Sequence, residues 1–194
     1  MTKIEFIIPT YNRTNHLICL LGSLMAQTSG NWTANVVVDY PAKEIIDEIN
    51  RIKAFFDSPK IKFTFLDKRY NDWGHTPRNL GVQMATQEWV IMTGEDNYYT
   101  PVFVDHFLKK IEAKVNFVFC NMLHNWTENQ YFPIQCKPEI NHIDIGCFMV
   151  RTALAKQMKL NTHLVEADGV FAKEYIKRFG GQIKHVEKIL YVHN

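Results

Sequence analysis

The sequence lacks the features that would place it among membrane or nucleic-acid-binding proteins. No stretch approaches the roughly 20 apolar residues of a membrane-spanning helix, and the apolar run near the start is soon stopped by Pro9. The formal net charge is only +2, from 22 lysines and arginines against 20 aspartates and glutamates. That balance is too small to mark a nucleic-acid-binding surface. We therefore expect a soluble, cytoplasmic protein with no nucleic-acid partner and no integral membrane segment.

Cysteine is also scarce, and its spacing excludes the common roles of cysteine clusters. The four cysteines form no CxxC pair and lie in mostly apolar surroundings: Cys19, Cys120, Cys136 and Cys147. This pattern favours reduced, buried thiols over a zinc site or a disulfide framework. A chain of 194 residues buries enough surface to fold without either of them.

Three motifs that often identify an enzyme are missing. The sequence contains no GxxxxGK[ST] phosphate loop, no GxGxxG after its first apolar run and no GxSxG nucleophile elbow. Their absence disfavours kinase-type ATP binding, a standard nicotinamide site and a serine nucleophile of the elbow type.

What the sequence does contain is an alternation of short apolar runs with amphipathic segments. Strands are predicted over 3–8, 33–39, 60–66, 88–93 and 115–120. Helices are predicted from 14 or 15, with Thr14 or Asn15 as the N-cap, from 41, and over 77–85 and 101–111. Parallel strands need helical crossovers and are buried on both faces. The pattern therefore predicts an α/β fold with a mostly parallel central sheet flanked by helices.

The alternation breaks after residue 120. Segment 121–141 is polar, aromatic and without a clear period. A strand is predicted again over 143–150, helices over 151–158 and 166–179, and two short strands over 182–186 and 188–192. We expect a single domain over 1–194.

Polar side chains gather where the predicted strands end, which is where ligands bind in open α/β sheets. Tyr11 could stack on a base, Asp39 could accept hydrogen bonds from a base or ribose, and Arg13 and Arg78 could meet phosphate charge. The acidic pair at 95–96 suits Mg²⁺ or Mn²⁺ beside a diphosphate. Taken singly, each residue is more often a cap or turn residue, but together they indicate a nucleotide-diphosphate site.

These segments resemble a known family. Phe6-Ile-Ile-Pro-Thr-Tyr-Asn-Arg13 is similar to the opening strand and loop of GT-A fold nucleotide-sugar glycosyltransferases, above all glycosyltransferase family 2. Pro77-Arg-Asn-Leu-Gly81, then Ala85 to Asn97 and Pro101, resemble its arginine-asparagine helix, fourth strand and acidic metal loop. Ile145-Gly-Cys-Phe-Met-Val-Arg151 and Glu166-Ala-Asp168 resemble its acceptor-side strand and catalytic acidic segment. The likeness covers nearly the whole chain, and it implies a nucleotide-binding half over about 1–120 and an acceptor-side half, partly antiparallel, over about 121–194.

The resemblance implies a donor site and a divalent cation, Mn²⁺ or Mg²⁺. The implied donor-binding residues are Pro9, Thr10, Tyr11, Arg13, Asp39, Arg78, Glu95 and Asp96. Asp96 would bind the metal, together with His193 near the end of the chain; an exposed terminal histidine is the competing interpretation. The chain departs from the family at Gly94, where the first acid of the metal motif is expected, which leaves that contact to Glu95 or Asn97.

For catalysis, the resemblance implies an inverting transfer with Asp168 as general base and Glu166 as the second choice. A helix cap is the competing role for Asp168. Acceptor recognition is assigned to Trp73, His75 and Trp126, although tryptophans also serve as packing residues.

The predicted function is therefore transfer of a sugar from a nucleotide-diphosphate sugar, foremost a UDP-sugar, to a hydroxyl acceptor such as a glycan. Three alternatives remain open on the sequence. They are a retaining transferase, a non-catalytic nucleotide-sugar or carbohydrate-binding domain of the same fold, and a sugar-1-phosphate nucleotidylyltransferase, which would need a glycine-rich, basic first loop.

Overall fold

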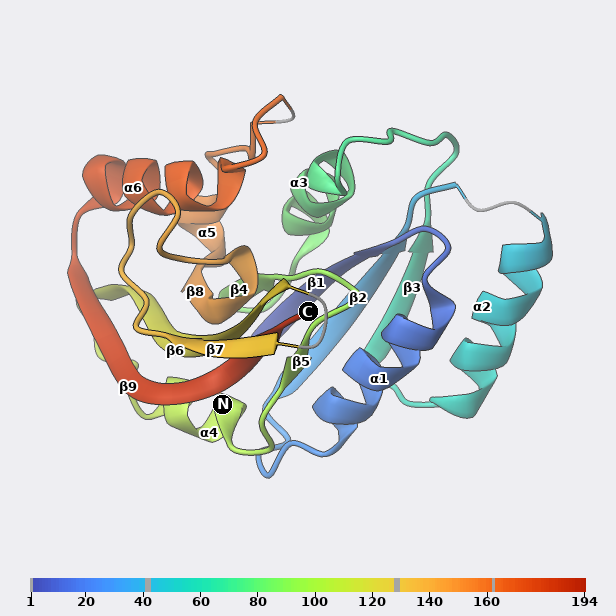
Figure 1. Cartoon of the computed structure of the whole chain (residues 1–194), viewed down its shortest axis with the longest axis horizontal. Helices are drawn as coiled ribbons and strands as arrows, with labels where there is room; N and C mark the ends of the chain where they lie inside the picture. Colours follow the sequence, from blue (N-terminus) through green and yellow to red (C-terminus); the bar gives the residue numbers. More distant parts are fainter. Residues whose placement is uncertain (1, 41–42, 128–129, 162) are drawn as a thin grey trace.

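The computed structural model describes residues 2–40, 43–127, 130–161 and 163–194. In the first part of the chain, strands and helices alternate (Figure 1) as β1 (Ile4–Thr10), α1 (Thr14–Met25), β2 (Trp32–Val38), α2 (Lys43–Phe55), β3 (Ile61–Phe65), α3 (His75–Met84), β4 (Trp89–Met92), β5 (Tyr98–Tyr99) and α4 (Phe103–Leu108). The second part contains β6 (Val115–Thr127), β7 (Gln130–Ile134), the 3-10 turn η1 (Ile145–Cys147), β8 (Phe148–Arg151), α5 (Thr152–Ala155), α6 (Ala167–Phe179) and β9 (Gln182–His193).

The strands form a mixed sheet in the order β3-β2-β1-β4-β8-β6-β9-β5, with β7 beside β6. Strands β1 to β4 pair in parallel, as do β6 and β9, whereas β8, β5 and β7 pair antiparallel to their neighbours. Helix α3 packs against β1 and β2, while α1 packs beside α2 and against β5. The predicted α/β architecture with an antiparallel acceptor-side portion is confirmed.

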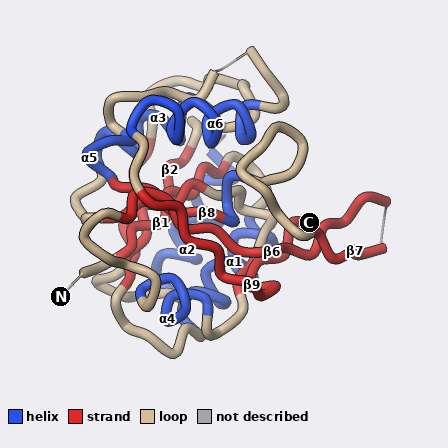
Figure 2. The backbone as a smooth tube through the Cα atoms, turned by 90° about the vertical axis from the view of Figure 1, so that its left-hand side faces the viewer, coloured by secondary structure: helices blue, strands red, loops and turns tan. Residues whose placement is uncertain are grey.

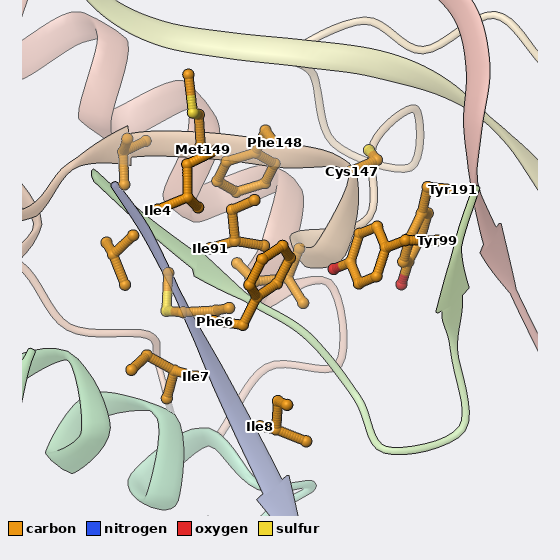
Figure 3. Close-up of a cluster of buried hydrophobic side chains, with 14 of the residues drawn as sticks. Ile4, Phe6, Ile7, Ile8, Ile91, Tyr99, Cys147, Phe148, Met149 and Tyr191 are labelled. Carbon is orange, nitrogen blue, oxygen red and sulfur yellow. The ribbon is translucent and has the colours of Figure 1, made fainter. Parts of the chain in front are cut away.

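The central strand β1 is buried along its whole length, as its apolar sequence predicts. Pro9 is tolerated in it because β4 pairs with β1 only up to Ile7, so the missing N–H lies beyond the last β4 pair. Around this strand, Phe6 packs against Tyr99 and near Ile91 and Phe148 (Figure 3). These side chains join the two halves of the sheet in one hydrophobic core.

The second half differs from the sequence prediction in its strands. Strand β6 continues to Thr127 and forms a hairpin with β7 where no period was predicted, and this hairpin projects from the body of the molecule (Figure 2). The two short strands predicted over 182–192 are one strand, β9, whose pairing with β6 shifts register after Cys120. Such an irregularity interrupts the apolar period in the sequence without ending the strand.

Two local predictions are wrong. Helix α1 begins at Thr14, so its N-cap is Arg13, and the Thr14 hydroxyl bonds to Glu48 instead of capping the helix. The four cysteines are free as expected, but Cys19 is exposed on α1 while the other three are buried. Among the described residues, no helix is long and apolar enough to cross a membrane.

Gly146 in η1 allows the Tyr191 ring to pack closely against the backbone, where any side chain would clash with it. A Cβ atom there would lie 2.5 Å from the Tyr191 hydroxyl and 2.6 Å from its ring, and Tyr191 is fully buried. We expect Gly146→Ala to lower the free energy of unfolding by about 1–3 kcal/mol, because Tyr191 has no room to retreat. Urea denaturation measures this loss.

The matched control is Gly22→Ala in α1, where a Cβ would meet no atom within 4 Å. This change should not destabilise the protein, since alanine is favoured over glycine in a helix by about 1 kcal/mol. Equal midpoints for Gly146→Ala and the unchanged protein would show that Tyr191 has space to move.

Candidate active site

A cavity of about 470 Å³ lies at the carboxyl ends of β1, β2 and β4. The residues that follow these strands point to one edge of the sheet because the strands are parallel. The structure brings all eight predicted donor-binding residues to the lining of this cavity, from four separate parts of the chain: Pro9, Thr10, Tyr11, Arg13, Asp39, Arg78, Glu95 and Asp96. Their roles in binding remain predictions.

Asp39 organises one wall of the cavity. It follows directly on β2, is only 6% exposed, and accepts hydrogen bonds from the backbone N–H groups of Tyr70 (3.0 Å) and Asn71 (3.4 Å). Asp39 thus holds the loop after β3 in addition to its predicted contact with a base. From that loop, the Arg69 guanidinium stacks on the Tyr11 ring, 3.6 Å from its centre. A base entering the cavity would therefore meet a stacked arginine–tyrosine pair.

Arg78 ties together two loops of the cavity. Its Nε donates to the Thr93 carbonyl (3.1 Å) after β4, and its Nη1 donates to the Trp73 carbonyl (2.8 Å) before α3. Trp73 has a φ of 56°, a left-handed conformation that is rare for a bulky residue. Arg78, itself buried, helps to hold this backbone while keeping positive charge at the cavity.

The acidic loop after β4 has little room at position 94. A Cβ on Gly94 would lie 2.7 Å from Oδ1 of Asp96 and 3.0 Å from Nδ2 of Asn97. The side chains of Asp96 and Asn97 thus occupy the space that an acidic residue at position 94 would need. Both atoms are the ends of flexible side chains, so an acidic residue at position 94 would require Asp96 and Asn97 to turn.

Asp96 and Glu95 differ in their surroundings. Asp96 forms an ion pair with Arg13, whose side chain is largely exposed. The pKa of Glu95 is raised to about 7, mainly by burial and also by the neighbouring Asp96 carboxylate, while Arg13 and Arg78 oppose the shift. Asp96 is therefore the stronger candidate for holding a cation.

Asp168 stands apart from the cavity lining, in the first turn of α6. Its carboxylate accepts a hydrogen bond from the Ile145 N–H (3.2 Å), and the N-cap position is Glu166, which makes no side-chain capping bond. The pKa of Asp168 is raised to about 7, chiefly by burial and then by the Asp144 carboxylate, against the opposing charge of Arg78. The carboxyl thus titrates near neutral pH, as a general base requires.

His193 is a partly buried residue at the end of β9. Its Nε2 lies 3.4 Å from Oδ2 of Asp144, and its Nδ1 is buried with no hydrogen-bond partner among the described residues. That orphaned nitrogen could serve as a ligand. Its neighbour Asn194 donates its backbone N–H to Asn97 (3.1 Å), so the end of β9 adjoins the acidic loop.

The described residues contain no group of three or more His, Cys, Asp and Glu side chains that could hold a metal ion. Mg²⁺, however, usually takes one or two carboxylates together with substrate phosphates and water. Asp96 supplies one such carboxylate in the cavity, whereas His193 is not among the residues that line it.

The predicted acceptor residues fall in different environments. Trp73 lines the cavity and is 65% exposed. His75 is buried and lies outside the lining, with its Nε2 3.1 Å from the Leu164 carbonyl; burial, followed by the charge of Arg78, lowers its pKa. The backbone of Trp126 lies in β6, but its side chain is outside the described part of the structure. Glu166 is exposed at the start of α6.

Sequence reasoning missed several residues of the site. The cavity is also lined by Asn12, Arg69, Asn71, Asp72, Gly74 and Gly94. Most of these belong to the loop after β3, which the sequence marks as rich in charge and aromatic side chains. Asp144 was missed as well, since it lies in the apolar run over 143–150, which the sequence predicts as a strand with no polar role.

A sequence model described as "Glycosyl transferase family 2" matches residues 5–146 of the chain. A protein of Haemophilus influenzae, described as an uncharacterized glycosyltransferase, is 25% identical over 127 residues, which cover 62% of this chain and 40% of that protein. The chain thus spans well under two thirds of the length of this relative.

Two solved structures are similar to the fold. The 1–349 fragment of S. aureus TarS superposes with a TM-score of 0.75 at 19% identity, covering 100% of this chain and 60% of that one, and TarS has also been solved with UDP and with UDP-GlcNAc. The mannosyltransferase PcManGT of Pyrobaculum calidifontis, in complex with GDP-Man and Mn²⁺, gives a TM-score of 0.78 at 14% identity, covering 98% and 56%. At these identities the likeness establishes a shared GT-A fold.

Proposed function

Because the chain belongs to glycosyl transferase family 2, we propose that it transfers a sugar from a nucleoside-diphosphate donor to a hydroxyl group of an acceptor such as a glycan. The observation that carries this proposal is the cavity where Tyr11, Asp39, Arg13, Arg78 and Asp96 meet. It combines an aromatic ring, a carboxylate and cationic groups, which together suit a nucleoside diphosphate.

We propose a UDP-sugar as the donor. The UDP and UDP-GlcNAc complexes of TarS support a uridine nucleotide, whereas the GDP-Man complex of PcManGT shows that this fold also accepts a guanosine nucleotide. In the chain itself, the Tyr11 ring and the Asp39 carboxylate would receive the base, and Arg13 and Arg78 would face the diphosphate.

In the proposed inverting reaction, Asp168 takes the proton from the acceptor hydroxyl while that oxygen forms a bond to the anomeric carbon. The bond from the anomeric carbon to the diphosphate oxygen breaks, and its electron pair leaves with the nucleoside diphosphate. The transition state resembles an oxocarbenium ion, so negative charge grows on the diphosphate. Arg78, held in place by two backbone carbonyls, is positioned to stabilise this charge.

Asp96 and His193 are the residues that would hold a divalent cation, Mn²⁺ or Mg²⁺. When bound, such a cation neutralises the leaving diphosphate. The ion pair between Arg13 and Asp96 holds the Asp96 carboxylate at the cavity before a donor arrives.

We expect UDP to raise the melting temperature of the protein, and UDP with Mn²⁺ to raise it further. A ligand that binds only the folded state at 100 times its dissociation constant adds about 2.7 kcal/mol to the free energy of unfolding. The measurement is a thermal shift series with UDP, GDP and dTDP, each with and without Mn²⁺. Donor hydrolysis over the matching nucleotide sugars then identifies the donor.

The controls separate the possible functions. If none of these nucleoside diphosphates shifts the melting temperature, the assigned donor site is wrong. UDP binding without donor hydrolysis, and without transfer over a panel of acceptors, would indicate a non-catalytic binding domain. This second function is considered because Gly94 stands where the first acidic residue of the metal motif is expected.

A further inference from the structure

Asp144 joins three parts of the chain that meet beside the cavity. Its Oδ1 accepts hydrogen bonds from the Gly146 N–H (2.8 Å) and from the Tyr191 hydroxyl of β9. Its Oδ2 lies 3.4 Å from Nε2 of His193 on the same strand. The next residue, Ile145, donates its N–H to Asp168 of α6 (3.2 Å). A single carboxylate thus adjoins both the predicted base and a predicted metal ligand.

The surroundings hold Asp144 in this orientation. Its carbonyl accepts from both the N–H (3.2 Å) and the thiol (3.0 Å) of Cys147. The Gly146 carbonyl accepts from the Tyr99 hydroxyl (3.0 Å), and the Tyr191 ring packs where a side chain at position 146 would lie. Tyr191 is fully buried and Tyr99 nearly so, which leaves the segment around Asp144 little freedom to move.

The contacts around Asp144 are linked to the donor cavity in two ways. One route runs through β9, because Asn194 beside His193 donates to Asn97 of the acidic loop. The other is electrostatic, because the positive charge of Arg78, which lines the cavity, acts on Asp168 against the charge of Asp144.

We propose that Asp144 is a positioning residue that holds Asp168 toward the acceptor hydroxyl and His193 toward the leaving diphosphate. It thereby fixes the position of the base relative to the histidine. This role rests on the proposed function. Asp144 acts through Asp168 and His193 and takes no proton from the acceptor itself.

The charge of Asp144 has a separate effect on each partner. Toward Asp168, it adds to burial in raising the pKa, against the opposing Arg78 guanidinium and Ile145 N–H, which keeps the carboxylate basic enough to take a proton. Toward His193, it fixes the ring through Nε2 and leaves Nδ1 as the nitrogen without a partner. A carboxylate behind a histidine commonly orients a metal-binding ring in this way.

Asp144→Asn is the variant that tests the role. Its Oδ1 can still accept from Gly146 and Tyr191, so the turn is retained, but the charge beside Asp168 and His193 is lost. We expect kcat for transfer to fall about 10- to 100-fold, with an unchanged affinity for UDP in the absence of a divalent cation. We also expect the Asp168 carboxyl, followed by carbon-13 NMR in the ligand-free protein, to titrate at lower pH, and the acid limb of the transfer rate to move the same way.

The matched control is Asp105→Asn on α4, which accepts from Thr28 outside the cavity lining and outside the Asp144 contacts. It should leave both the titration and the transfer rate unchanged. Should Asp144→Asn fail to fold, Tyr191→Phe replaces it, because this change removes one hydrogen bond to Asp144 and keeps the buried ring.

The outcomes separate this role from the proposed function. An unmoved Asp168 titration together with an unchanged kcat would overturn the role of Asp144. A shift of the Asp168 titration in Asp144→Asn supports the contact between the two residues, whether or not the unchanged protein transfers sugar. Absence of sugar transfer by the unchanged protein would overturn the proposed function instead. A loss of UDP binding in Asp144→Asn without a divalent cation would show that the residue supports the fold of the cavity and not the alignment of the base.

Discussion

Replacing Asp168 by asparagine is expected to abolish sugar transfer while UDP binding is retained. The amide has the size of the carboxyl and can still accept from the Ile145 N–H, but it cannot take a proton from the acceptor hydroxyl. Because general base catalysis contributes about 10²- to 10⁴-fold, kcat should fall by a factor in this range. Steady-state transfer assays measure the fall, and the UDP-induced rise in melting temperature checks that the donor site is intact.

Glu166→Gln is the matched control for this variant. Glu166 lies two residues earlier, is exposed and makes no capping hydrogen bond, so its loss should change kcat little. If Glu166→Gln were inactive and Asp168→Asn active, the assignment of the base would be reversed.

The pH profile of the unchanged protein gives an independent check on the base. The pKa of Asp168 is raised to about 7 and the base acts in its deprotonated form, so transfer should decline as the pH falls through 7. Well below that value the rate should drop about tenfold for each pH unit. A rate that stays constant down to pH 5 would contradict a base with this pKa.

The second large effect is expected from Asp96→Ala. This change removes the carboxylate of the acidic loop that faces the cavity and carries its charge in an ion pair with Arg13. In the proposed reaction, a divalent cation would then lose its main protein ligand, and with it several kcal/mol of charge stabilisation on the leaving diphosphate. We expect the stimulation of transfer by Mn²⁺ to disappear and kcat to fall by about 10² to 10³.

Glu95→Gln is the comparison for Asp96→Ala. The pKa of Glu95 is raised to about 7, mainly by burial, so its carboxyl is partly neutral near pH 7 and a neutral amide changes less. UDP should still stabilise Asp96→Ala without Mn²⁺, since the freed Arg13 can turn to the diphosphate. Full stimulation by Mn²⁺ in Asp96→Ala would show that the cation is held elsewhere.

The gathering of Pro9, Asp39 and Glu95 around one cavity could be predicted because these residues follow strands that the sequence makes recognisable. The apolar run before Pro9, the valines before Asp39 and the short strand before Glu95 each end where polar residues begin. Parallel strands bring such ends to one edge of the sheet. The end of each strand, which the sequence reveals, is therefore enough to predict that these residues lie around one cavity.

The acceptor side could not be predicted to the same extent because distant segments form it. Strand β9 pairs with β6 through register shifts that break its apolar period, and the β6–β7 hairpin lies in a polar, aromatic stretch without alternation. Asp144 gains its partners from Tyr191 and His193, nearly fifty residues further along the chain. No local pattern records such a contact.

The sequence by itself determined the α/β fold, the strand ends that carry the polar residues and the likeness to family 2, because strand and helix periods and turn residues are local properties. Its near-zero net charge concealed a local separation of charge. Only the tertiary structure decided that Arg13 pairs with Asp96 and that Asp144 stands between Asp168 and His193. The physical reason is that the charge state of a side chain depends on its burial and its neighbours, and both are set by packing between segments far apart in the sequence.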